Sequence, residues 1–157
     1  MIWCRLLLLS CIGALASLPV VAMEQSSDAL LAKYPTLAEF TGKPAAVNLA
    51  SHKDARRFRT VLRQTAPAGP NFAGHMTVAT WGCGTSCQMV ALIDARDGTV
   101  HFGPVSTVGI KHRISSRLLI IDSPEDIKEV WGDYDPPFKL VTTYYLWENN
   151  KLLEIKP

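Results

Sequence analysis

The spacing of apolar residues changes partway along this chain, and that change constrains the fold more than any other feature of the sequence. Ala55, Phe58 and Leu62 recur at the spacing of one helix face. After the turn-forming run Pro67-Ala68-Gly69-Pro70 the pattern becomes strand-like, with β-branched and aromatic residues at short intervals. The sequence therefore predicts helices in the first half and strands in the second.

Two short helices are predicted before residue 70. Ser27 is a suitable N-cap for a helix that ends near Tyr34, because Pro35 disfavours helical backbone before it. Ser51 is the expected N-cap of the second helix, with Asp54 near its positive end. The arginines of the second helix are predicted to form a solvated face rather than an anion site, because glycine-rich backbone donors are missing. These arginines are Arg56, Arg57, Arg59 and Arg63.

The predicted strands are joined mainly by short connections. Arg96-Asp97-Gly98 and Asn149-Asn150 suit hairpin turns. The strand-like segments are 76–81, 88–94, 99–102, 117–122, 142–148 and 151–155. Local connections favour antiparallel pairing. We therefore expect an α+β fold, in which one or two short N-terminal helices pack on an antiparallel β-meander of about five strands.

The aromatic segment near the C-terminus alternates between the two faces of its predicted strand. Tyr145 and Trp147 share one face, and Tyr144 and Leu146 share the other. One face is expected to join the core, and the other is a candidate binding surface.

The first 22 residues have the order of a secretory signal peptide. Arg5 precedes an apolar run, Pro19 breaks it, and Val20-Val21-Ala22 offers small residues for cleavage. We expect residues 1–22 to be removed, leaving an N-terminal extension at 23–48, with room for the first helix, and one β-rich domain at 49–157. A periplasmic or secreted location follows. Two alternatives are a membrane anchor, for which the apolar run is short, and a lipoprotein modified at Cys11.

The balance of charge excludes some partners. The formal net charge is +2, and loss of Arg5 lowers it by one. Such a chain has no electrostatic preference for nucleic acid or acidic lipid. The acidic residues between Asp122 and Asp135 lack the spacing of an EF-hand loop, so a solvated loop is predicted there. We expect no cofactor, no metal, no nucleic acid and no membrane span after signal cleavage.

Two glycine-containing motifs flank the strand predicted at 76–81. They are Gly69-Pro70-Asn71-Phe72-Ala73-Gly74-His75 and Trp81-Gly82-Cys83-Gly84-Thr85-Ser86-Cys87-Gln88. Together with the segments 54–59, 116–120 and 143–147, they resemble a family of small exported proteins, mainly of proteobacteria. The resemblance covers about residues 50–155 and implies export. The family has no established activity, so the resemblance supplies no catalytic residue and no ligand.

Three hypotheses account for the two cysteines beyond the predicted cleavage site. In the favoured one, Cys83 and Cys87 form a disulfide, as even pairing in an exported protein suggests. In the second, one of the two thiols is a nucleophile with His75 or His101 as its base, although no third, orienting acid is identifiable. In the third, both cysteines and His75 bind a metal, but only three ligands are at hand.

The favoured function is a non-enzymatic periplasmic binding module for an unknown protein or cell-envelope ligand. A loop fixed by a disulfide binds without the cost of ordering it. The candidate binding residues are Asn71, Phe72, His75, Trp81, Gly84, Thr85, Ser86 and Gln88. One alternative is a thiol-dependent hydrolase or transferase that uses Cys83 and His75, and another is a structural accessory domain. Both His75 and His101 are also explained by structural roles near the backbone.

Overall fold

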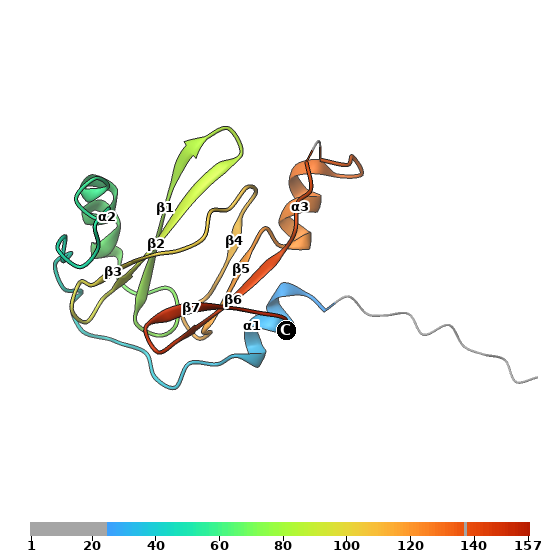
Figure 1. Ribbon diagram of the computed structural model, residues 1–157. Helices are drawn as coiled ribbons and strands as arrows, with labels where there is room; N and C mark the ends of the chain where they lie inside the picture. The colour runs from blue at the N-terminus through green and yellow to red at the C-terminus, as the bar shows by residue number, and fades with distance from the viewer. Residues whose placement is uncertain (1–24, 137) are drawn as a thin grey trace, which may run out of the picture.

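The computed structural model describes residues 25–136 and 138–157, so the predicted signal peptide lies outside the described residues. The elements in chain order are α1 (Ser27–Lys33), α2 (Arg59–Thr65), the 3-10 helix η1 (Ala66–Ala68), β1 (Met76–Gly84), β2 (Cys87–Asp94), β3 (Val100–Phe102), β4 (Ile110–Lys111), β5 (Leu118–Ile121), α3 (Pro124–Trp131), β6 (Thr143–Glu148) and β7 (Lys151–Ile155). The fold is α+β, as the sequence predicts (Figure 1).

The strands of the described residues form two antiparallel sheets instead of one. Their orders are β1-β2-β3 and β4-β5-β6-β7, so each sheet is a meander of sequence neighbours. The chain leaves the first sheet after residue 106, which still pairs with Gln88 on β2. Asp122 then holds the turn that leads to β4, because its Oδ1 accepts hydrogen bonds from the backbone N–H groups of Thr107 and Val108, both at 2.8 Å. This corner divides the predicted single meander in two.

The two sheets and two helices bury three apolar clusters. The central cluster lies between the sheets and includes Val78 and Leu92 from the first sheet and Leu119 and Trp147 from the second. A second cluster lies between the first sheet and α2, and a third lies between the second sheet and α1. Figure 1 shows α2 beside the first sheet and α1 below the second sheet.

Both faces of β6 are covered. Trp147 is buried and Tyr145 packs against the central cluster, as expected for the core face. Tyr144 on the other face packs against the cluster that contains Leu30 and Leu31 of α1. The face considered a binding surface is therefore occupied by α1, and the predicted extension at 23–48 contributes to the folded body through this helix.

The expected helix caps are displaced. Ser26, not Ser27, caps α1, because Ser27 donates its hydroxyl hydrogen bond to Glu125 Oε2 at 2.6 Å. Ser51 does not cap α2, which begins eight residues later at Arg59. Its hydroxyl instead accepts a hydrogen bond from the Val100 backbone N–H at 2.9 Å, and this bond ties the segment before α2 to β3.

The docking face predicted for the second helix is confirmed. Ala55 and Leu62 are completely buried, and half-buried Phe58 packs beside them. The four arginines of this segment are exposed. Apolar spacing thus identified the buried face, although the regular helix begins later than expected.

The acidic connection predicted as a solvated loop contains α3. Ser123 caps this helix by accepting a hydrogen bond from the Asp126 backbone N–H at 3.1 Å, and Pro124 occupies the first helical position. Asp126 forms an ion pair with Lys111, at 2.7 Å between its Oδ1 and Nζ. Part of the acidic run is therefore structural.

Candidate functional site

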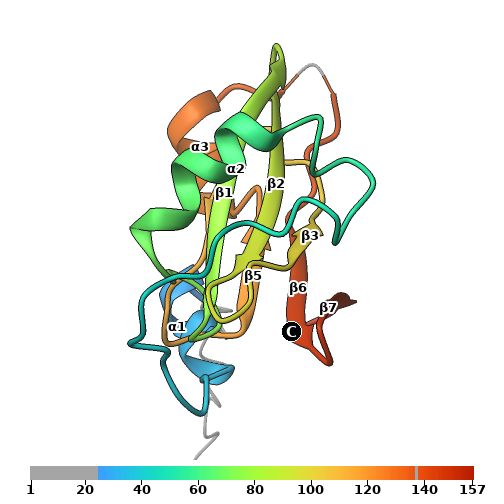
Figure 2. The ribbon, with the colours of Figure 1, turned by 90° about the vertical axis from the view of Figure 1, so that its left-hand side faces the viewer.

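The β1–β2 hairpin extends beyond the core (Figure 2). β1 is buried from Met76 to Ala79, and β2 is buried from Val90 onward. Between these positions most residues are exposed or half-buried. The hairpin projects because β3 pairs with only three residues of β2, Ala91–Ile93, and leaves the outer half of the hairpin without a regular neighbouring strand.

A disulfide joins Cys83 and Cys87 near the tip of this hairpin, as predicted. Their Cα atoms lie 5.1 Å apart. The register of the two strands shifts between Gly82 and Gly84, so that Cys83 occupies the irregular position. Ser86 has a positive φ of 51°, which completes the reversal. Because both sulfurs are bonded to each other, neither cysteine is a free thiol or a metal ligand in this structure.

A shallow hollow of about 430 Å³ lies beside the disulfide. Its lining residues are Thr80, Trp81, Gly82, Gly84, Ser86, Cys87, Gln88 and Thr107. Gly82 and Gln88 face each other across the two strands, and Thr107 comes from the corner held by Asp122. The lining of the hollow is mostly threonine, glycine, serine and glutamine, whereas pockets that bind small molecules are lined mostly by apolar side chains.

The structure brings together one part of the predicted binding loop and separates another. Trp81, Gly84, Ser86 and Gln88 line the hollow, and Thr85 is an exposed residue of the turn beside it. The remaining three candidates, Asn71, Phe72 and His75, lie before the start of β1. His75 and Cys83 are eight residues apart along an extended strand, about 26 Å at ~3.3 Å per residue.

The separated candidates have structural roles. The Asn71 side-chain oxygen accepts a hydrogen bond from the Val78 backbone N–H at 2.8 Å. Phe72 is completely buried in the central cluster. His75 lies beside the turn between β2 and β3, where its carbonyl oxygen accepts a hydrogen bond from the Ala95 backbone N–H at 2.8 Å. The motif that contains them anchors the beginning of β1.

His75 borders the ion pair between buried Asp94 and exposed Arg96. Asp94 accepts hydrogen bonds from the Arg96 guanidinium, the shortest being 2.6 Å from Nη2 to Oδ2. Burial alone would raise the pKa of Asp94, but the hydrogen bonds from Arg96 outweigh it and lower that pKa. Burial, together with the nearby Arg96 charge, lowers the pKa of His75. His75 Nε2 lies 3.8 Å from Asp94 Oδ2, so the histidine packs on this structural pair far from the cysteines.

Aromatic packing explains two further candidates. His101 packs edge-on against Trp147, with ring centroids 5.0 Å apart, and burial lowers its pKa. Trp81 packs against Phe58 and Phe102, with ring centroids 4.8 and 6.0 Å away. Trp81 thus joins the base of the projecting hairpin to the α2 side of the first sheet.

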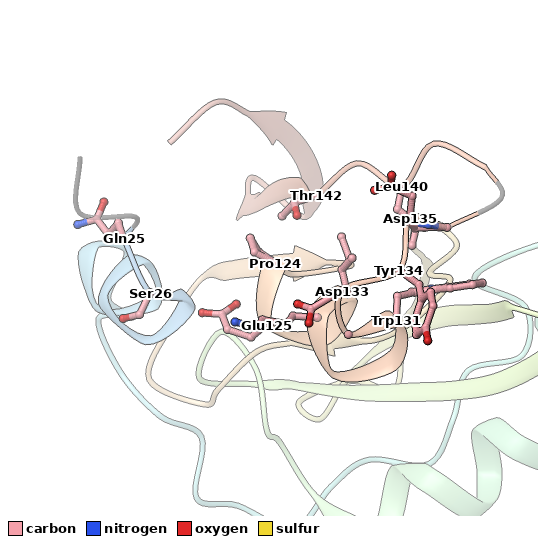
Figure 3. A pocket seen from close by; sticks show the side chains of 14 residues that line it. Gln25, Ser26, Pro124, Glu125, Trp131, Asp133, Tyr134, Asp135, Leu140 and Thr142 are labelled. Atoms are coloured by element: carbon pink, nitrogen blue, oxygen red, sulfur yellow. The ribbon is translucent and has the colours of Figure 1, made fainter. Parts of the chain in front are cut away.

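Another hollow, of about 660 Å³, lies along α3 (Figure 3). Its lining residues are Gln25, Ser26, Pro124, Glu125, Ile127, Lys128, Trp131, Gly132, Asp133, Tyr134, Asp135, Pro136, Leu140 and Thr142. The hollow was not expected, because the acidic residues of α3 indicated a solvated loop, although Ser123-Pro124-Glu125-Asp126 carries a helix-start signal. Glu125 on its wall is already engaged, because it accepts hydrogen bonds from the Ser27 N–H and hydroxyl.

Among residues 25–136 and 138–157, no three histidine, cysteine or acidic side chains are grouped so that they could hold a metal ion. Within the same residues, no helix is both long and apolar enough to span a membrane. Comparison with protein-family models, with curated proteins and with solved structures gave no match.

Proposed function

We propose that the protein is an exported, non-enzymatic module that binds a protein partner through the outer half of the β1–β2 hairpin. We call residues 80–88 the hairpin tip. We also propose that the protein and its partner meet in the periplasm or outside the cell. The predicted signal peptide and the resemblance to small exported proteins support export, and a disulfide suits an oxidising compartment.

The observation that carries this proposal is the absence of charge in an exposed, projecting element. The chain has 30 charged residues, 16 basic and 14 acidic, yet residues 76–93 contain none. In this run the hairpin tip is mostly exposed, so its composition does not follow from burial. Protein interfaces are depleted in charged residues at their centres, because such residues lose their hydration there. An uncharged surface held in shape is therefore suited to association.

The disulfide supports the same function. Cys83 and Cys87 close a very short loop, so the bond contributes little through chain entropy and mainly fixes local shape. A surface fixed before binding loses less conformational freedom on association. The thiol-enzyme alternative receives no such support, because Cys83 is bonded to Cys87 and His75 lies at the other end of β1.

Capture from the periplasm of the native host tests the proposal with matched variants. Thr85→Lys places one charge in the hairpin tip, and Ala32→Lys places the same charge at an exposed position of α1, which lies at the opposite end of the molecule from the hairpin tip (Figure 1). Quantitative mass spectrometry should find one protein that is enriched by the wild type and by Ala32→Lys and is lost with Thr85→Lys. Equal recovery with both variants would place the binding surface elsewhere, and enrichment of a glycan or lipid alone would replace the protein partner.

A further inference from the structure

Positive charge is concentrated in the part of the chain around α2. Between positions 40 and 93 the sequence has one acidic residue, Asp54, and six basic residues. None of these basic residues forms an ion pair with a carboxylate in the described part of the chain. The small net charge of the whole chain therefore conceals a local excess of positive charge. The six basic residues are Lys43, Lys53, Arg56, Arg57, Arg59 and Arg63.

A hollow of about 610 Å³ lies within this basic region. One wall is the apolar segment 44–47, and the other contains Ala66 and Pro67. Lys43 and Arg63, both exposed, also line the hollow, and the lining residues that the structure describes include no carboxylate. Pockets of about 300–1,000 Å³ that combine mostly apolar walls with a few charged groups are typical of small-molecule sites.

Both walls of the hollow are held in place by the fold. The Ala45 N–H donates to the Ala95 carbonyl at 2.9 Å, and the Asn48 N–H donates to the Gly98 carbonyl at 2.8 Å. These bonds fix the first wall to the turn between β2 and β3. Ala66 of the second wall is buried in the cluster between the first sheet and α2. The hollow is therefore formed before any ligand arrives, which reduces the entropy lost on binding.

We propose that this hollow binds a free single-chain anionic amphiphile, a hydrocarbon chain that ends in a carboxylate. The chain lies against the apolar walls, and the carboxylate contacts Lys43 and Arg63. A guanidinium can donate two parallel hydrogen bonds to one carboxylate. The bound anion also offsets the repulsion between Arg63 and Arg59, which lie four residues apart on α2.

The surroundings of the hollow favour a free molecule over a membrane surface. Stable docking on an anionic bilayer combines the attraction of cations with apolar side chains that enter the bilayer. No large exposed apolar residue of the described chain belongs to the two segments that form the hollow, 43–47 and 63–67. The apolar surface here is recessed instead of protruding. The large exposed apolar residues are Leu37, Val105, Val130, Tyr134, Phe138, Val141 and Leu153.

This inference goes beyond the proposed function and does not rest on it. The hollow shares no lining residue with the one beside the disulfide. Among the four arginines predicted to form a solvated face, Arg63 is the one that borders the hollow. Loss of a protein partner with Thr85→Lys and loss of amphiphile binding at Arg63 are therefore separate results.

Titration of the purified protein, residues 23–157, with decanoate below its micelle concentration tests the site. Amide resonances of residues 43–47 and 63–67 should shift and saturate. Acetate, which has the charge without the chain, and decyltrimethylammonium, which has the chain with the opposite charge, should cause no saturable shift there. Absence of saturable shifts with decanoate, or equal affinity for the cationic amphiphile, would overturn the proposal.

Sedimentation with phosphatidylglycerol vesicles distinguishes the free amphiphile from a membrane. The protein should stay in the supernatant. Sedimentation with the vesicles, together with no response to decanoate, would overturn the proposal in favour of a membrane surface.

Two matched variants locate the carboxylate. Arg63→Gln removes one charge from the lining and should raise the Kd for decanoate about tenfold. Arg56→Gln removes the same charge from an exposed position outside the lining and should leave that Kd unchanged. Equal weakening by the two variants would show attraction to the general positive charge and would overturn the assignment of the hollow.

Discussion

Single polar side chains join distant parts of this chain. Asp122, at the end of β5, accepts hydrogen bonds at its Oδ1 from the Ser106 hydroxyl at 2.9 Å and from two backbone N–H groups of the turn before β4. Glu125 links α3 to α1 through Ser27. Neither contact was predictable from the sequence, because each joins residues whose proximity depends on the tertiary fold. Both are open to direct test.

Replacing Asp122 by Ala should reduce the free energy of unfolding by about 3 kcal/mol, because the buried Ser106 hydroxyl and the half-buried backbone N–H groups of the turn lose their acceptor. The positive φ of 52° at this position adds strain for Ala. Asp122→Asn keeps an acceptor oxygen and tolerates this backbone, so it should cost clearly less. Denaturant melts of both variants measure the difference. Equal losses would show that the hydrogen bonds at Asp122 do not hold the corner between the sheets.

The pH dependence of stability should report the contact between Glu125 and Ser27. Slight burial would raise the pKa of Glu125, but hydrogen bonds led by those from Ser27 lower it from 4.5 to about 2. Between these values the unfolded chain binds the proton and the folded chain does not, so stability should fall as the pH drops from about 4.5 to about 2. Above pH 4.5 the contribution is fully present.

Glu125→Gln provides the control, because it cannot titrate. The variant should lose less stability than the wild type over the same acidic range in thermal or denaturant melts. Identical acid profiles would mean that Ser27 does not favour the ionised form of Glu125.

At the scale of elements, the sequence predicted what depends on local pattern. The turn residues Asn149 and Asn150, both with positive φ, join β6 and β7 as expected. The apolar spacing around Leu62 identified the docking face of α2. The two-residue strand β4 has too little sequence to show alternation, and α3 was hidden by acidic residues that suggested a solvated loop. The helix start predicted at Ser51 was wrong, because the Ser51 hydroxyl accepts a hydrogen bond from β3 instead of capping α2.

The disulfide of the hairpin tip can be removed by substituting its two cysteines. A Cys83→Ser, Cys87→Ser double variant should still fold, with about 1–3 kcal/mol lost, because the disulfide closes a short loop. Its binding to the captured partner should fall by more than that loss explains, since the fixed shape of the turn is lost. Melts and titrations measure the two effects, and reduction of the wild type should add about 2 Da to its intact mass. Unchanged partner binding by the double variant would contradict the role given to the disulfide.

At the scale of the whole molecule, α+β class and antiparallel pairing followed from the sequence, whereas the division into two sheets did not. The division depends on the corner around Asp122, which no periodicity encodes. Two parts of the candidate site were predictable: the disulfide and the residues near Gln88. Both were predictable because glycines and cysteines mark that turn. The prediction that Asn71 belongs to the same site was wrong. Asn71 and the turn are close in sequence, but the extended strand β1 between them holds them far apart in space.

In-cell photo-cross-linking most directly tests whether the hairpin tip binds a protein. A photoreactive residue is placed at Thr85 in one variant and at Ala32 in a matched variant, so that the two probes lie at opposite ends of the molecule (Figure 1). The account predicts one discrete adduct with another exported protein at position 85 and none at position 32. The same adducts at both positions, or an adduct only at position 32, would contradict it.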